Sequence, residues 1–372
     1  MDQSNSILDK VMDSHKTQEK EHFYPLELVA TLLKYLSNKE EDILRRRFGL
    51  NMPQKETLEE IGHSYNVTRE RIRQIENNSV AKIKSLKNFD QLIGSVDHLI
   101  NSIITDNGGF VEEQMLLENL VGNSDEKEMD SRAVQFFLQV LLKGKYHYSS
   151  NSRIRPTWGL KHSSKDSLEK AIEEFYKIIE KEGAPMSSEK IVAEFKKTET
   201  YKNNQMSIND NAIKSFLHVS KKIDNNPYGE FGLAEWGSIT PKRINDKIYL
   251  VLKKNDKPMH FVEIAEEINR IKFDRRKAYP PTIHNELIMN KQYVLVGRGI
   301  YALKEWGYKP GVVADVLADI LEKSDKPLKR KELVEEVLKK RIVKKNTIHL
   351  ALTNRSRFKK LPDGAYALAE KK

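Results

Sequence analysis

The segment that begins at Thr57 most constrains what this chain can fold into, because its spacing predicts two short helices joined by a tight turn. Thr57 and Glu60 have the spacing of a capping box, which is typical of a helix N-terminus. Gly62 leaves room for a second helix to cross close by, and Asn66 belongs to the few residue types besides glycine that adopt a left-handed backbone. Thr68 then caps the second helix. This order of signals predicts a helix-turn-helix.

The second of these helices has two faces of opposite character. Ile72 and Ile75 are spaced to point inward, whereas the opposite face carries the polar residues Arg69, Glu70, Arg73 and Gln74. Arg can bond guanine in a bidentate way, Glu can accept from the cytosine amino group and Gln can pair with adenine, each good pair contributing about 1–3 kcal/mol of discrimination. The alternative is an ordinary solvated face on which Glu70 balances the two arginines.

At residues 36–86 the chain resembles region 4 of the primary (sigma-70 family) bacterial sigma factors. The resemblance is carried by residues 36–40, 43–44, 47–50, 57–62 and 67–76. It implies that the second helix reads a promoter −35 element in double-stranded DNA, and that the preceding helices dock on the flap of the RNA polymerase β subunit. It also implies that Thr57 and Leu58 meet a phosphate, for which a helix N-terminus is suited. We include the cap Thr68 among the predicted DNA-binding residues.

The chain departs from that family in what surrounds the resemblance. A working sigma factor also needs domains that grip polymerase and melt the −10 element, and these normally precede region 4. Only 35 residues precede Leu36, and they are polar and charged. We therefore expect that this chain is not a complete sigma factor.

Beyond residue 90 the sequence repeats weakly in four modules, which we number first to fourth: 91–160, 166–237, 242–309 and 312–370. The third and fourth modules echo each other three times in the same order, residues 255–259 with 324–328, 282–287 with 347–352, and 298–303 with 363–368. The second module is a weaker repeat and the first the faintest. Modules of this length fold alone only marginally.

Local signals inside one module follow a fixed order. In the third module we expect helices at 244–252, 261–269 and 281–289, then strands at 293–296 and 300–303. Three helices followed by a β-hairpin make a winged helix. The last two modules resemble the HARE-HTH winged-helix family, which includes the N-terminal domain of the bacterial RNA polymerase delta subunit. That resemblance implies association with DNA or with the transcription machinery, and some members of the fold bind protein.

Two basic sites in these modules are further candidates for DNA contact. Arg298 lies between Gly297 and Gly299, where the missing strand-to-helix setting and Lys-Ser/Thr favour a hairpin tip over a phosphate loop. From such a tip Arg298 can enter a minor groove, or it is a simple exposed charge. Lys344 and Lys345 precede the third helix of the fourth module, where they can approach a DNA backbone or form a solvated face.

Charge is unevenly spread along the chain, whose formal net charge is +10. Residues 242–311 hold 15 Lys and Arg against 8 Asp and Glu, and residues 312–372 hold 16 against 9. Residues 91–160 hold 6 against 9, and residues 161–241 hold 12 against 13. A basic surplus attracts nucleic acid through counterion release, so we expect such contact from the C-terminal third.

The sequence lacks the features that several classes of site and function require. There is no Cys, so disulfides, a thiol nucleophile and zinc fingers are excluded, and the 10 His lack metal-ligand spacing. No apolar run approaches the ~18 residues of a membrane span, and the N-terminus lacks signal-peptide order. We expect a cytoplasmic protein with no membrane partner, and with no catalytic residues, metal, cofactor or small-molecule substrate.

The prediction for the whole chain is a mainly α fold with small β-hairpins. It comprises a polar tail at 1–24, a sigma region 4-like helix-turn-helix at 25–90, and the four tandem modules as winged helices. The favoured function is a DNA-binding transcription regulator that recognises a −35-like element. The alternative is a non-catalytic accessory or anti-initiation factor that binds RNA polymerase through protein contacts.

Overall fold

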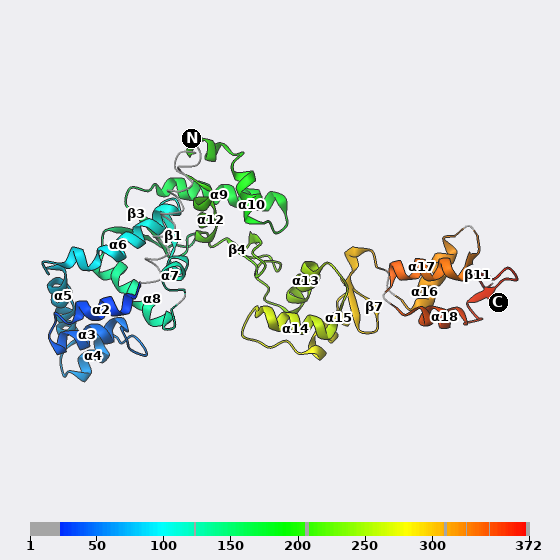
Figure 1. The fold of residues 1–372 in the computed structure, drawn as a ribbon, viewed down its shortest axis with the longest axis horizontal. Coiled ribbons are helices and arrows are strands. Elements are labelled where there is room, and N and C mark those ends of the chain that lie inside the picture. Colours follow the sequence, from blue (N-terminus) through cyan, green and yellow to red (C-terminus); the bar gives the residue numbers. More distant parts are fainter. Residues whose placement is uncertain are drawn as a thin grey trace. The chain divides into compact units, whose positions relative to one another are not determined.

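The computed structural model describes residues 23–122, 124–204, 208–308, 311–324, 326–341 and 343–369. The predicted tail at 1–24 thus lies almost wholly outside the described residues. The chain divides into two compact units, residues 1–224 and 225–372, and each is described by itself (Figure 1). Within the described part, none of the helices combines the length and apolar character that crossing a bilayer requires.

The first unit begins with the helices of the predicted helix-turn-helix, drawn in blue in Figure 1. They are α2 (Pro25–Leu33), α3 (Asn38–Phe48), α4 (Leu58–Ser64) and α5 (Arg69–Lys84). The start of α3 is fixed by a capping box between Ser37 and Glu40, and its end by Gly49 in the left-handed conformation, with φ of 68°. A fifth helix, α6 (Phe89–Asp106), leads into the next module.

The first module places strand β1 between its first two helices and closes with a hairpin. Its elements after α6 are β1 (Phe110–Glu112), α7 (Glu113–Val121), α8 (Lys127–Phe136), the π-helical turn η1 (Phe137–Leu141), β2 (Tyr146–Ser149) and β3 (Thr157–Leu160). The three strands form an antiparallel sheet in the order β1-β3-β2. The predicted β2–β3 hairpin is therefore part of a three-stranded sheet, in which β1 is the additional strand.

One hydrophobic core runs from the helix-turn-helix into the first module without a break at residue 90. It joins Val29, Leu32 and Leu44 to residues of the module such as Leu116 and Phe137. Contacts between α2 and α8 close this core, and the two helices lie side by side in Figure 1. Residues 25–160 are thus held together by shared burial, not only by the chain connection.

Polar contacts reinforce the same junction. The backbone N–H of Leu26 donates to Asp130 Oδ1 at 3.2 Å, and Arg132 Nη1 donates to the carbonyl oxygen of Met52 at 2.8 Å. The rings of Phe48 and Phe136 lie 4.9 Å apart, a distance typical of favourable aromatic pairs. These contacts attach α8 to α2, to the end of α3 and to the loop that follows α3.

The second module is built from helices whose N-termini are capped by short polar side chains. Its elements are α9 (Lys165–Glu182), α10 (Ser188–Phe195), α11 (Glu199–Asn204), α12 (Asp210–Val219), β4 (Ile223–Asn225) and β5 (Phe231–Leu233). Ser164, Ser187 and Asn209 accept from the backbone N–H three residues ahead. Its helix α11 is additional to the repeated pattern.

The second unit holds the third and fourth modules, which share one element order. The third has α13 (Ile244–Asn255), β6 (Met259–His260), α14 (Phe261–Ile271), α15 (Pro280–Met289), β7 (Tyr293–Gly297), β8 (Ile300–Leu303) and the 3₁₀ turn η2 (Lys304–Trp306). The fourth has α16 (Val313–Glu322), β9 (Leu328–Lys329), α17 (Arg330–Lys340), α18 (Lys345–Leu352), β10 (Phe358–Lys360) and β11 (Ala365–Leu368).

The sequence echoes of these two modules fall at equivalent places in the fold. Ile283 of α15 and Ile348 of α18 are both fully buried, and Tyr301 of β8 and Tyr366 of β11 both enter the module cores. The sheets have the equivalent orders β6-β8-β7 and β10-β11-β9. The predicted three helices and two strands of the third module are confirmed, and so is the mainly helical fold with small antiparallel sheets.

Candidate nucleic-acid interface

Helix α4 begins where the capping box predicts. The Thr57 hydroxyl accepts from the backbone N–H of Glu60 at 3.2 Å, and the Glu60 carboxylate accepts from the backbone N–H of Thr57 at 2.7 Å. These hydrogen bonds lower the pKa of Glu60, chiefly through the backbone N–H of Thr57. Leu58 turns its side chain into the core, whereas Glu59 and Glu60 of the same turn are exposed.

The turn between α4 and α5 is tight, as Gly62 and Asn66 predict. A Cβ added to Gly62 would lie 2.8 Å from the carbonyl oxygen of Val67, so only glycine allows this close approach. Asn66 has φ of 52°, in the left-handed region. The backbone N–H of Val67 donates to the carbonyl oxygen of Gly62 at 3.0 Å, which closes the turn.

Helix α5 is fixed by its cap and by one buried face. The Thr68 hydroxyl accepts from the backbone N–H of Arg71 at 3.2 Å. Ile72 packs with Ile43, Leu58 and Ile61, and this small core also includes the partly buried Tyr65, Val67 and Ile75. The orientation of α5 about its axis is therefore set by burial.

The predicted reading residues Arg69, Glu70, Arg73 and Gln74 are all exposed on α5. Arg73 donates to Glu70 through Nε at 2.8 Å and Nη2 at 2.7 Å, and both side chains remain more than half exposed, at 54% and 57%. This pairing lowers the pKa of Glu70. An exposed ion pair of this kind contributes little to stability, so the two side chains can exchange it for base contacts at small cost.

A further polar residue of α5, absent from the sequence prediction, is Asn77. It is exposed and lies one helical turn beyond Arg73 and Gln74, which places it on the same face. An asparagine side chain can pair with adenine in a bidentate way. The i+3/i+4 spacing from Arg73 and Gln74 is the signal that could have found it.

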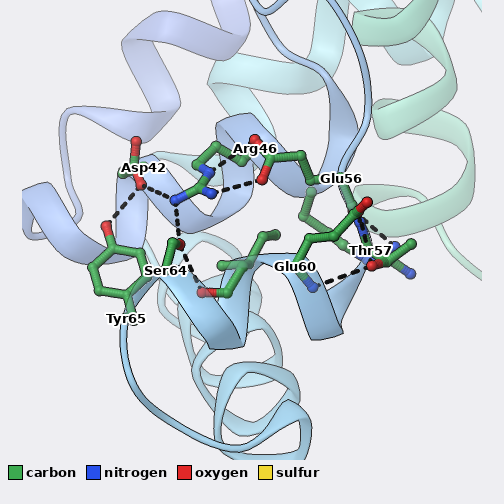
Figure 2. Close-up of polar contacts among 9 residues, drawn as sticks. Asp42, Arg46, Glu56, Thr57, Glu60, Ser64 and Tyr65 are labelled. Carbon is green, nitrogen blue, oxygen red and sulfur yellow. Dashed lines mark hydrogen bonds and ion pairs between the residues drawn. The ribbon is translucent and has the colours of Figure 1, made fainter.

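A polar network centred on Arg46 braces α4 from α3 (Figure 2). Arg46 donates to Glu56 through Nε at 2.9 Å and Nη2 at 2.6 Å, and to the hydroxyl of Ser64 at 2.8 Å. Asp42 lies 3.6 Å from Arg46 and accepts from the Tyr65 hydroxyl at 2.7 Å. The network thus ties α3 to the chain just before α4 and to the C-terminal end of α4.

The other predicted DNA-binding residues belong to the second unit and are not brought to α5 by the fold of the first. Arg298 is exposed at the tip of the β7–β8 hairpin, where Gly299 has φ of 71°, as the glycine pattern predicts. Lys344 and Lys345 are exposed at the N-terminus of α18. Their neighbour Arg341 departs from a solvated charge run, because it is only 4% exposed and donates to the carbonyl oxygens of Leu295 and Gly311.

The described residues hold no cluster of three His, Asp or Glu side chains with the geometry of a metal site. One open cavity in the first unit, about 740 Å³, lies between α2 and the α7–α8 turn and is lined partly by the acidic Glu27, Glu118 and Asp125. None of the residues predicted to bind DNA lines it. The interface described above is therefore a surface and not a pocket.

The arrangement of α4 and α5 defines the class of domain: a helix-turn-helix whose second helix is buried on one face and polar on the other. Residues 32–85 match the protein family described as "Sigma-70, region 4". The resemblance predicted for residues 36–86 is thereby confirmed.

Individual relatives agree with this match and show its extent. RNA polymerase sigma factor RpoD of Neisseria gonorrhoeae is 41% identical over 71 residues, which are 19% of this chain and 11% of that protein. Sigma factor SigA1 of Synechococcus elongatus is 53% identical over 53 residues, 14% of this chain and 13% of the relative. Sigma factor SigA of Listeria monocytogenes is 40% identical over 87 residues, 23% of each chain. The chain thus spans less than a quarter of the length of these relatives.

Proposed function

We propose that this protein is a DNA-binding transcription regulator that recognises a promoter −35-like element through α5. One observation carries the proposal: within the region similar to sigma-70 region 4, the residues Arg69, Glu70, Arg73 and Gln74 are exposed together on the face of α5 opposite the core. A helix of this kind docks in the major groove with its N-terminal residues at the base edges. In this position Arg73 would exchange its bonds to Glu70 for bonds to a guanine.

The cap of α4 would hold the DNA backbone in this arrangement. The Thr57 hydroxyl already exchanges hydrogen bonds with Glu60, so the phosphate contact that we propose uses backbone N–H groups of the first turn, at Leu58 and Glu59. Thr68, at the start of α5, would lie beside the same groove. These contacts would set the register of α5, and the base contacts would set its specificity.

We further propose that the modules after residue 90 are winged helices, of the HARE-HTH type in the third and fourth. The order of helix, strand, helix, helix and hairpin supports this assignment in the first, third and fourth modules, and helices followed by two strands support it in the second. In this proposal Arg298 at the hairpin tip enters a minor groove, and Lys344 and Lys345 contact the backbone. Tandem modules on one duplex would add affinity through effective concentration.

The second candidate function is a polymerase-bound accessory or anti-initiation factor. It is favoured by residues 91–160, which carry 6 Lys and Arg against 9 Asp and Glu and so suit a protein partner better than DNA. In that role the β-subunit flap of RNA polymerase would dock on α2 and α3. The apolar face of α2 is already buried in the shared core, so docking would use exposed side chains such as Tyr24 and Tyr35. Either function is exercised in the cytoplasm.

A binding competition separates the two functions. Full-length protein bound to a labelled promoter duplex is challenged with unlabelled promoter duplex or with a scrambled duplex of equal length and composition. If the protein is a sequence-specific regulator, the scrambled duplex should compete at least tenfold more weakly than the promoter duplex. Typical regulators bind specific sites about 10³-fold more tightly than non-specific DNA. Equal competition together with retention of RNA polymerase would support the accessory factor instead.

A further inference from the structure

The turn between α14 and α15 in the third module, residues 272–279, is held in a defined shape. Asn269 Nδ2 donates to the carbonyl oxygen of Ala278 at 2.8 Å, and its Oδ1 accepts from the backbone N–H of Ala278 at 2.7 Å. Asp274 accepts from Lys247 Nζ at 2.6 Å and from the backbone N–H of Arg276 at 2.9 Å. We call this segment the basic turn. Its one acidic side chain is thus engaged by the nearly buried Lys247.

The basic turn exposes a cluster of cations whose side chains form no ion pair within the described part of the protein. Its four members are Lys272, Arg275, Arg276 and Lys277, and no ion pair to any of them is recorded among the described residues. Elsewhere in the same module Arg270 pairs with Glu267 at 2.5 Å and Lys253 with Glu305 at 2.7 Å. Four adjacent like charges repel one another, and an anionic partner would relieve that repulsion.

The surroundings of the basic turn favour a polyanion contacted by side chains. The turn leads into the N-terminus of α15, where the helix dipole also attracts negative charge. Pro280 and Pro281 have no backbone N–H to offer, so the Lys and Arg side chains must make the hydrogen bonds. Tyr279, 59% exposed, adds an aromatic ring within 5.8 Å of Lys277 Nζ.

The equivalent turn of the first module lacks this character, and that of the fourth module shares it only in part. In the first module the α7–α8 turn carries Asp125 and Glu126, and α8 is packed against the helix-turn-helix. In the fourth module the corresponding segment turns Arg341 inward onto backbone carbonyls and exposes Lys344 and Lys345 at the N-terminus of α18. The fold of these modules therefore does not dictate a basic surface, and the third module exposes four cations in this turn.

We propose that the basic turn is a second, sequence-independent DNA-binding site that contacts the phosphate backbone of duplex DNA. The proposal rests on the function proposed above, because the duplex that α5 reads supplies the polyanion. A cluster of exposed Lys and Arg side chains whose one acidic neighbour, Asp274, is engaged by Lys247 binds phosphates regardless of base sequence. The third module thereby anchors the duplex, while α5 supplies the specificity.

The test removes the four charges in the full-length protein. One variant carries Lys272→Gln, Arg275→Gln, Arg276→Gln and Lys277→Gln. The matched control loses four other exposed cations of the same module, through Lys242→Gln, Lys257→Gln, Lys291→Gln and Lys304→Gln. Affinity for a promoter duplex and for a scrambled duplex is measured from low to physiological salt, and thermal melting verifies that each variant is folded.

The proposal predicts that the basic-turn variant binds both duplexes more weakly. The slope of log affinity against log salt should become less steep by up to about 3.6, which is 0.9 for each of four phosphates. The control should flatten it clearly less. Equal flattening in both variants would overturn the proposal, and so would tighter, basic-turn-dependent binding of single-stranded RNA than of duplex DNA. If the wild type prefers no sequence but the basic turn still sets the salt slope, the α5 function fails and this inference stands.

Discussion

At the residue scale, the helix-turn-helix is shaped by contacts between residues that are close along the chain. The capping pair Thr57 and Glu60, the left-handed Asn66 and the close approach at Gly62 all follow from spacings of a few residues, and the structure confirms each of them. The pairing of Arg73 with Glu70 shows that the reading face has internal order before any DNA is bound. Arg341 illustrates the limit, because its basic neighbours suggested solvation and only the tertiary fold buries it.

Asn77 provides a prediction at this scale. If α5 lies in the major groove, Asn77→Ala removes one amide contact, so preference should weaken at a single base position by about 1–3 kcal/mol while non-specific binding stays unchanged. The measurement is affinity for a set of duplexes that differ at one position each. Gln91→Ala, which removes an exposed amide from α6, is the matched control and should change nothing. An unchanged profile for Asn77→Ala would remove this residue from the interface.

At the element scale, the helices and hairpins were predictable because each has its own caps, turns and hydrophobic period. The polar contacts between elements were not predictable. Arg46 bonds Glu56 and Ser64, which lie 10 and 18 residues further along the chain, and no spacing rule connects them. The short strand β6 was also missed, because its two residues pair with β8 across some forty positions of the chain and carry no pattern of their own. The helices and strands could therefore be predicted from the sequence, whereas the contacts that join them to one another could not.

The Arg46 network supplies a prediction at the scale of elements. Arg46→Ala leaves the largely buried Glu56 without its bidentate partner, so the free energy of unfolding of the first unit should fall by about 1–3 kcal/mol. Arg45→Ala is a matched control, because Arg45 pairs with Glu41 within α3, a contact worth only about 0.3–0.5 kcal/mol. Urea denaturation measures both variants. Equal losses would mean that the network does not brace the helix-turn-helix.

At the scale of the whole molecule, the chain combines one sigma region 4-like domain with repeated small modules. The division into four modules stays a prediction from internal echoes in the sequence, whereas the mainly helical content is confirmed. The core shared by residues 25–160 was not, because Phe48 and Phe136 or Leu26 and Asp130 come together only through the tertiary fold. The first module therefore supports α5, the helix that we propose reads DNA, whereas the basic surplus lies in the modules of the second unit.

The shared core predicts cooperative unfolding of the helix-turn-helix and the first module. Phe136→Ala removes a nearly fully buried ring and should cost about 3–5 kcal/mol. Hydrogen exchange should then accelerate in α5 as well as in α8, because both depend on one core. Leu317→Ala, in the separate core of the fourth module, should leave exchange in α5 unchanged. Acceleration confined to α8 after Phe136→Ala would show that the two parts unfold independently.

The most direct test of the central claim is selection of bound sequences from a random pool of duplex DNA by the full-length protein. A parallel selection uses a variant with Arg69→Ala and Arg73→Ala, whose exposed side chains are not needed for the fold. If α5 reads DNA, the wild type should enrich one motif and the double variant should lose it, while weak non-specific binding persists. A motif that survives the double substitution, or a folded wild-type protein that enriches none, would contradict the assignment of α5 as the reading helix.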